Sequence, residues 1–213
     1  MNDYQTASWI YKLSQKTVKL ILRLLYHFKI EGTENVPAGQ GCLLVANHVS
    51  FIDPPVVACS LNHRRVCFMA RDTLSKSRLG KWYFDGIGAV ALDRTKGDVG
   101  ALRKAISLLK EGRTLGFFPE GTRSPDGQLK PAKAGVGFLV FKGNVPVVPA
   151  YIDGTFKALP KSATWPKLSM ISIRYGKPIM PEDLKSLGTG KEAYEKIGQL
   201  VMSKIAELKS RTE

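Results

Sequence analysis

Short apolar runs alternate with segments of helical periodicity along most of this chain. The apolar and β-branched runs predict strands over residues 42–46, 66–70, 89–92, 114–118, 147–152 and 170–175. Apolar positions that repeat every three or four residues predict helices over 54–61, 74–84, 99–109, 135–141 and 191–209. Turn residues and prolines predict a turn at 124–127 and a surface loop at 158–167. The alternation predicts an α/β fold with a mainly parallel sheet flanked by helices.

The first thirty residues have a different pattern, because no acidic residue occurs between Asp3 and Glu31. Basic residues interrupt the apolar positions there, at Lys12, Lys16, Lys19, Arg23 and Lys29. These charges leave too short an apolar run to span a bilayer, which takes about 20 residues, and no signal-peptide cleavage site follows. The pattern predicts an amphipathic helix or helix pair in the membrane interface, with headgroup-level anchors at Tyr4, Trp9, Tyr11 and Tyr26. An ordinary helix packed on the domain is the alternative.

The composition indicates the number of domains and the charge of the expected partners, and it argues against a zinc site. A chain of 213 residues with 44% hydrophobic residues suits one compact domain, here 31–213, after the interfacial element over 1–30. The formal net charge of +14 predicts attraction to nucleic acid, an anionic membrane or a phosphorylated substrate. The three cysteines, Cys42, Cys59 and Cys67, lie in apolar surroundings without a CxxC pair, so they are expected to be buried thiols and not a zinc site.

Polar side chains follow three of the predicted strands. In open parallel sheets, ligands bind beyond the carboxyl ends of the strands, so these positions are the candidate site. They are Asn47, His48 and Asp53 after the first strand, Asp93 and Arg94 after the third, and Glu120 to Ser124 after the fourth.

His48 and Asp53 are five residues apart, a spacing that no regular element would bring together. Five residues rotate a helix by roughly 140° past a full turn, and an odd separation on a strand points two side chains to opposite faces. A strand ending at Ala46, a turn, and a helix with Asp53 as N-cap and Pro54 as first residue would fold the imidazole over the helix start. Taken alone, the pair is equally consistent with a helix cap and a turn histidine.

A histidine beside a carboxylate is suited to general-base catalysis, because the carboxylate fixes the tautomer and stabilises the imidazolium. No GxSxG elbow occurs in the sequence, and Ser50 fits a turn hydroxyl better than a nucleophile, so the base is expected to act on a substrate hydroxyl. Arg94 and Arg123 are suited to bidentate phosphate binding, or each is a solvated surface arginine. Glu120 could bind substrate hydroxyls or pair with Arg123.

Four sequence blocks, in order, resemble those of the glycerolipid acyltransferases, specifically the 1-acylglycerol-3-phosphate O-acyltransferase (lysophosphatidic acid acyltransferase) family. The first is the HxxxxD motif in NHVSFID at 47–53, and the others are GAVALDR at 88–94, FPEGTRS at 118–124 and VPVVPA at 145–150. HxxxxD alone is a weak signal, whereas FPEGTRS downstream of it is specific. The four blocks cover roughly residues 30–180, nearly all of the predicted domain.

The resemblance implies the α/β acyltransferase fold and a single-displacement acyl transfer with no acyl-enzyme. His48 would take the proton of the sn-2 hydroxyl of lysophosphatidate as it attacks an acyl thioester, and Asp53 would hold the imidazole. The other roles implied are glycerol phosphate binding by Arg94, Glu120, Gly121, Thr122 and Arg123, and an acyl-binding wall at Pro149. Lys133 matches a recurrent family lysine or is a surface lysine at a helix start. Arg71 stands where many members carry a lysine, and it would have to serve with planar donors.

The implied partners are acyl-CoA or acyl carrier protein as donor, lysophosphatidate as acceptor and an anionic membrane surface, with no cofactor, no metal and no nucleic acid. The expected location is peripheral, on the cytoplasmic face of the cell membrane. Alternative acceptors are glycerol 3-phosphate, another lysophospholipid or a lyso-aminolipid. From another class of function, the alternative is a non-catalytic basic protein that binds membranes or nucleic acid, although the sequence has no zinc finger, RNP-like strand or basic recognition helix.

Overall fold

The computed structural model contains one sheet of seven strands in the order β1-β7-β6-β2-β5-β3-β4. It describes residues 7–62, 64–71, 78, 82, 86–87, 90–92, 97–133 and 135–210, with backbone alone at 70, 71, 90–92, 97, 98 and 101. The strands are β1 (Lys29–Glu31), β2 (Leu43–Ala46), β3 (Val66–Arg71), β4 (Val90–Leu92), β5 (Thr114–Phe117), β6 (Val147–Asp153) and β7 (Ser172–Tyr175). Five of the six neighbouring pairs are parallel, and β6 with β7 is antiparallel. Strands β6, β2, β5, β3 and β4 therefore end at the same edge.

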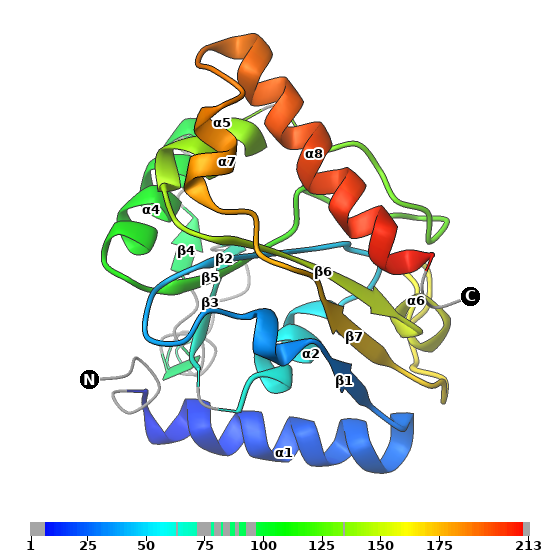
Figure 1. The fold of residues 1–213 in the computed structure, drawn as a ribbon. Helices are drawn as coiled ribbons and strands as arrows, with labels where there is room; N and C mark the ends of the chain where they lie inside the picture. The colour runs from blue at the N-terminus through cyan, green and yellow to red at the C-terminus, as the bar shows by residue number, and fades with distance from the viewer. Residues whose placement is uncertain are drawn as a thin grey trace.

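Helices cover both faces of the sheet (Figure 1). On one side lie α1 (Trp9–Tyr26) and α2 (Asp53–Ser60), and on the other α4 (Gly97–Lys110), α5 (Val136–Gly143), α7 (Pro181–Lys185) and α8 (Lys191–Lys209). The central strand β2 is buried on both faces, since Leu44 contacts the core under α1 and α2 while Val45 contacts the core under α4, α5 and α8. This is the continuous apolar pattern that strands covered on both sides require.

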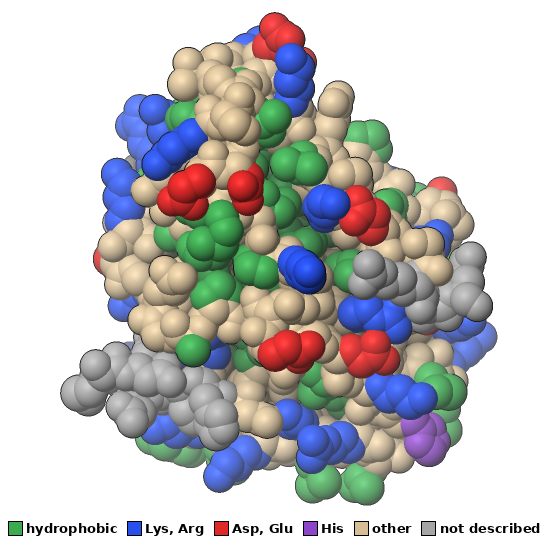
Figure 2. All heavy atoms as spheres, in the orientation of Figure 1, with side chains coloured by type: hydrophobic (Ala, Val, Ile, Leu, Met, Phe, Trp, Pro, Cys, Tyr) green, Lys and Arg blue, Asp and Glu red, His purple; other side chains and the backbone are tan. Residues whose placement is uncertain are grey.

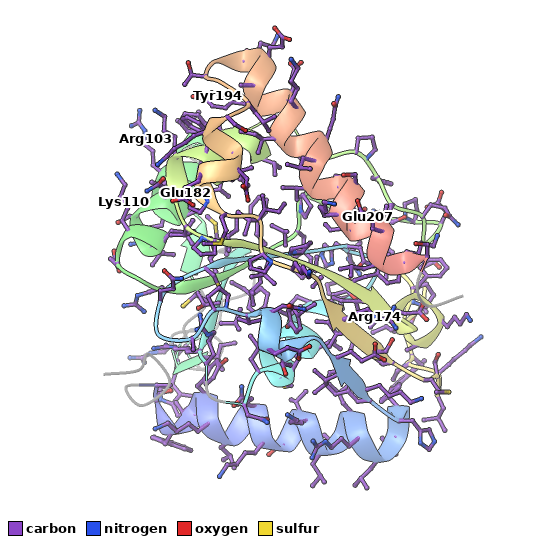
Figure 3. The ribbon with its side chains drawn as sticks, viewed as in Figure 1. Arg103, Lys110, Arg174, Glu182, Tyr194 and Glu207 are labelled. Atoms are coloured by element: carbon purple, nitrogen blue, oxygen red, sulfur yellow. The ribbon has the colours of Figure 1, made fainter. Side chains whose placement is uncertain are left out.

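Two of the side chains labelled in Figure 3, Tyr194 and Arg174, hold outer elements in place. Tyr194 of α8 packs against two phenylalanines of α5, Phe138 and Phe141, each with ring centroids 5.5 Å apart. Arg174 of β7 donates from Nε to the Glu31 carboxylate, at 2.7 Å, and from Nη1 to the Leu208 carbonyl, at 3.1 Å. The edge strand β1 and the end of α8 are thereby held to the same strand.

The predicted alternation of strands and helices is confirmed along the described chain, and four short elements were not predicted. These are β1, α7 and α6 (Thr155–Ala158), together with the 3-10 turn at Thr33–Asn35. Elements of three to five residues are too short to display a periodicity. Most of the predicted helix over 74–84, and the start of the predicted strand at Ala89, lie outside the described residues.

Helix α1 is both packed on the domain and exposed along an apolar stripe. Its inner face buries Tyr11, Gln15, Leu22 and Tyr26. Tyr11 accepts the backbone N–H of Val66 at 3.0 Å, so the expectation that Tyr11 and Tyr26 are headgroup anchors is wrong: both serve the contact with the domain. The outer face exposes large apolar residues between the lysines, namely Trp9, Leu13, Leu20, Ile21, Leu24 and Leu25. Figure 2 shows hydrophobic and basic side chains together along the lower edge, where α1 lies.

No helix among the described residues has the length and hydropathy that a membrane crossing requires.

Candidate active site

The site begins where β2 ends, at a buried asparagine. The side-chain amide of Asn47 donates to the Ile152 carbonyl at 2.9 Å, and its oxygen accepts the Ile152 N–H at 2.7 Å. Asn47 thus continues the pairing with β6 by one more step through its side chain. The end of β2 is thereby tied to β6 at the residue before His48, where the chain leaves the strand and begins the turn. The sequence offered only a polar residue at a strand end as a signal of this role.

The Asp53 carboxylate is the centre of the turn. It is fully buried, and its Oδ2 atom lies 2.8 Å from His48 Nδ1 and accepts the backbone N–H groups of Val49, at 2.7 Å, and Ser50, at 2.8 Å. The predicted contact between His48 and Asp53 is confirmed. The predicted N-cap is off by one residue, because α2 begins at Asp53 itself and Ile52 precedes it without a capping side chain. The carboxylate accepts from the turn before the helix, and not from the helix.

The imidazole of His48 is held by a ring stacked on its face and by the Asp53 carboxylate at Nδ1. Its ring is stacked on Phe118, with centroids 4.2 Å apart and planes at 17°, and Phe118 in turn lies 6.1 Å from the ring of Phe68. The side chain retains 18% exposure. With Nδ1 directed at Asp53, Nε2 is the ring nitrogen left to meet a substrate. The stacking partner comes from the end of the neighbouring strand β5, a long-range contact that the sequence did not reveal.

The loop after β5 holds the backbone of His48. Glu120 is buried, and its Oε1 accepts the His48 N–H at 2.8 Å, while the Ser124 N–H donates to the His48 carbonyl at 2.7 Å. Burial raises the pKa of the Glu120 carboxyl, and the bond from the His48 N–H acts in the opposite direction. Glu120 therefore positions the backbone of His48, a role that its place in the sequence did not indicate.

The Arg123 guanidinium lies over an aromatic ring beside the dyad. Its guanidinium carbon is 3.3 Å from the ring centroid of Phe51, an exposed residue of the turn between His48 and Asp53. Such a cation–π contact attracts the guanidinium to the ring face and so helps to hold Arg123 beside the turn. Phe51 is a variable position of the HxxxxD motif, so the motif did not predict this contact.

Lys133 and Gly121 lie side by side in the same loop region. The Lys133 N–H donates to the Pro119 carbonyl at 2.9 Å. Gly121 has a φ of +65°, in the left-handed region, and a Cβ there would come within 2.5 Å of Lys133 Cδ. Glycine at 121 thus lets the lysine stem cross the loop, and Thr122 beside it is exposed. The structure brings Lys133 to the loop that also carries Glu120 and Arg123.

The structure does not describe the side chains of two predicted site residues, Arg71 and Arg94, and it places a third, Pro149, away from the dyad. Arg71 ends β3 at the same sheet edge, but only its backbone is described, and Arg94 lies outside the described residues, two positions beyond the end of β4. Pro149 is buried in β6, where its neighbours Val147 and Tyr151 contact the core under α8. Because side chains alternate along a strand, Pro149 points away from the face that carries the dyad. The described structure does not bring it to His48.

Among the side chains that the structure describes, no group of three His, Cys, Asp or Glu residues could hold a metal ion.

Comparison with known proteins shows the family of this chain. The family model described as Acyltransferase matches residues 27–153. The chain belongs to the Acyltransferase family. The matched segment runs from β1 to the end of β6, and so contains the dyad, the loop after β5, Arg71, Arg94, Lys133 and Pro149.

Relatives within the Acyltransferase family differ in how much of their length this chain spans. It is 27% identical to a 1-acyl-sn-glycerol-3-phosphate acyltransferase of Bacillus subtilis, over 96% of this chain and 99% of that protein. It is 34% identical to the chloroplastic 1-acyl-sn-glycerol-3-phosphate acyltransferase BAT2 of Brassica napus, over 63% of this chain but only 40% of that protein. The crystal structure of the 1-acyl-sn-glycerophosphate (LPA) acyltransferase PlsC from Thermotoga maritima superposes with a TM-score of 0.78 at 31% identity, covering 93% of this chain and 79% of that one.

Proposed function

We propose that this protein transfers a fatty acyl group from an acyl thioester to the sn-2 hydroxyl of 1-acylglycerol 3-phosphate, giving phosphatidic acid for phospholipid biosynthesis. The observation that carries the proposal is the dyad at the sheet edge, in which Asp53 holds Nδ1 of His48 at 2.8 Å. The names of the relatives support the choice of acceptor. The Acyltransferase match over the segment that contains the dyad supports the reaction class.

The dyad supports a direct transfer. His48 Nε2 removes the proton of the sn-2 hydroxyl as the oxygen attacks the thioester carbonyl, and the buried Asp53 carboxylate stabilises the imidazolium that forms. The tetrahedral intermediate then collapses: the carbon–sulfur bond breaks, the ester remains, and the imidazolium returns its proton to the departing thiolate. No side chain carries the acyl group in this scheme. The scheme is compatible with a sequence that contains no GxSxG elbow.

The loop after β5 is the proposed phosphate site. Arg123 presents a guanidinium held by Phe51 at the rim, and Lys133 crosses the same loop beside Gly121. Arg71 is the last residue of β3 and Arg94 comes two residues after β4, and both strands end at this edge, so both arginines are proposed to complete the anion site. Gly121 and Thr122 shape the loop at which the glycerol phosphate would bind.

Arg123→Ala should lower kcat/KM for 1-acylglycerol 3-phosphate by about 10 to 150-fold. A charge-assisted contact to phosphate contributes roughly 1.5 to 3 kcal/mol, which corresponds to this range. The loss should be much smaller with a monoacylglycerol acceptor, which lacks the phosphate. The measurement is the initial rate of product formation for both acceptors. Phe51→Leu keeps an apolar side chain but removes the ring, and it should give a smaller loss of the preference for the phosphorylated acceptor. Equal losses of Arg123→Ala on both acceptors would assign Arg123 a structural role.

Membrane association is proposed to bring the site to its lipid substrates. The exposed stripe of α1 presents Leu20, Leu24 and Trp9 beside Lys16 and Arg23, a combination suited to an anionic interface. We therefore propose a peripheral, monotopic protein on the cytoplasmic face, with residues 1–30 as its interfacial element and 31–213 as its catalytic domain. Acyl-CoA and acyl carrier protein are both anionic donors, and both remain candidates for the thioester.

A further inference from the structure

A second exposed apolar surface lies far from α1 in sequence. The loop between α6 and β7, residues 159–170, carries three large apolar side chains that are mostly exposed: Trp165 at 80%, Leu168 at 74% and Met170 at 59%. Two lysines of the same loop, Lys161 and Lys167, are exposed beside them. A cluster of this kind on a surface loop indicates a partner that covers it, because exposed apolar area is unfavourable in water.

The charge pattern of this region repeats that of the first thirty residues. No acidic residue occurs between Asp153 and Glu182, just as none occurs between Asp3 and Glu31. The segment instead contains five basic residues, Lys157, Lys161, Lys167, Arg174 and Lys177. Two segments distant in sequence thus share the same chemistry: tryptophan and aliphatic side chains among positive charges. Tryptophan and lysine are the residues that favour the interface of a bilayer.

The fold places this loop directly beside the end of α1. The Ile171 N–H donates to the Tyr26 carbonyl at 2.9 Å, and the Lys29 N–H donates to the Ile171 carbonyl at 3.0 Å. Met170 therefore adjoins the last turn of α1, where Leu24 and Leu25 are exposed. In Figure 1 the yellow segment after α6 descends on the side of the C-terminal end of α1. The loop and the outer stripe of α1 form neighbouring parts of one surface.

The other end of the loop contacts the catalytic turn. Ser50, whose N–H bonds to Asp53, donates from Oγ to the Leu159 carbonyl at 2.7 Å and forms an antiparallel bridge with Pro160. The loop also closes on itself, since the Lys167 N–H donates to the Ala158 carbonyl at 2.7 Å. The exposed side chains thus sit on a preformed loop that runs from the rim of the site to the end of α1.

We propose that loop 159–170 is a second membrane-docking element, which binds an anionic bilayer together with α1 and holds the bilayer surface against the rim of the active site. The inference rests on the proposed function for its purpose, because an acceptor drawn from the leaflet would then enter next to His48. Charge favours a bilayer over a protein partner: the loop offers cations and apolar side chains with no acidic group to pair with a mixed-charge surface.

Two matched pairs of variants test the loop. Trp165→Ala/Leu168→Ala should weaken binding to phosphatidylcholine–phosphatidylglycerol vesicles at least about 100-fold, at low and high salt alike, at about tenfold or more for each buried side chain. Lys161→Gln/Lys167→Gln should weaken it by about 25-fold at low salt and much less at high salt or on phosphatidylcholine alone, at about fivefold for each lysine. The controls are Met180→Ala, at the residue before α7, and Lys185→Gln/Lys191→Gln, in α7 and α8. They change exposed apolar and basic residues outside the loop and should bind as the unmodified protein does.

Vesicle sedimentation measures binding without any turnover, so the result stands apart from the proposed function. Turnover on a short-chain, water-soluble acceptor without vesicles is measured in parallel. Unchanged rates in the loop variants support docking. An inactive unmodified protein would overturn the proposed function but not the binding result. Undiminished binding of both loop variants, or equal losses in the controls, would overturn the inference. So would a dimer in sedimentation velocity that Trp165→Ala/Leu168→Ala converts to a monomer, because a second copy would then be the partner.

Discussion

His48→Ala is expected to lower the turnover number by about 10² to 10⁴, the usual contribution of a general base, while the protein stays folded. The imidazole stacks on Phe118 at the rim and is partly exposed, so its removal leaves no large cavity in the core. Initial rates of thioester-dependent acylation, with thermal unfolding measured on the same preparation, check the expectation. His27→Asn is the matched control, because it removes an exposed imidazole at a left-handed position that asparagine tolerates. Near-normal turnover in folded His48→Ala would remove His48 from the mechanism.

Asp53→Asn is expected to lower turnover by at least about tenfold, because hydrogen bonds to a charged group are stronger than neutral ones and the imidazolium would lose its counter-charge. Asparagine keeps one oxygen that can accept from His48, Val49 and Ser50, so the turn should survive. Alanine is the poorer test, since it would strand two buried backbone N–H groups at a cost of about 1 to 3 kcal/mol each.

The double variant separates a catalytic role for Asp53 from a structural one. If Asp53 acts through His48, then His48→Ala/Asp53→Asn should be no slower than His48→Ala alone, because the two losses are not additive. Asp183→Asn, which alters an exposed carboxylate of α7 that accepts the Met180 N–H, should leave turnover close to normal. Additive losses in the double variant would contradict the assignment of Asp53 as the group that orients the imidazole.

The part of the site that lies within one turn was predictable from sequence. His48 and Asp53 are joined by a single strand-to-helix turn, and their spacing excludes a regular element. The exact start of α2 was missed by one residue, because a capping pattern does not tell which N–H groups a carboxylate will accept. Asp53 bonds to groups before the helix.

Contacts between distant segments were not predictable, although several of them hold the dyad in place. Phe118 stacks on the imidazole and Glu120 binds the His48 backbone because β5 lies beside β2 in the sheet, an order that no local pattern encodes. Pro149 shows the opposite case: its sequence block suggested a role in the site, but the alternation of side chains along β6 directs it to the other face. The sequence pattern likewise predicted Tyr11 as an interfacial anchor, but its hydroxyl accepts the Val66 N–H inside the domain.

Acyl transfer by His48 is tested most directly by product formation from an acyl thioester and 1-acylglycerol 3-phosphate with the purified protein, followed by the mass of the lipid product. Both acyl-CoA and acyl carrier protein are supplied as donors, and glycerol 3-phosphate and other lysolipids serve as comparison acceptors. We expect phosphatidic acid with the new acyl group at sn-2, formed fastest from 1-acylglycerol 3-phosphate and lost in His48→Ala. Absence of phosphatidic acid with both donors, or a rate that His48→Ala leaves unchanged, would rule out the proposed transfer.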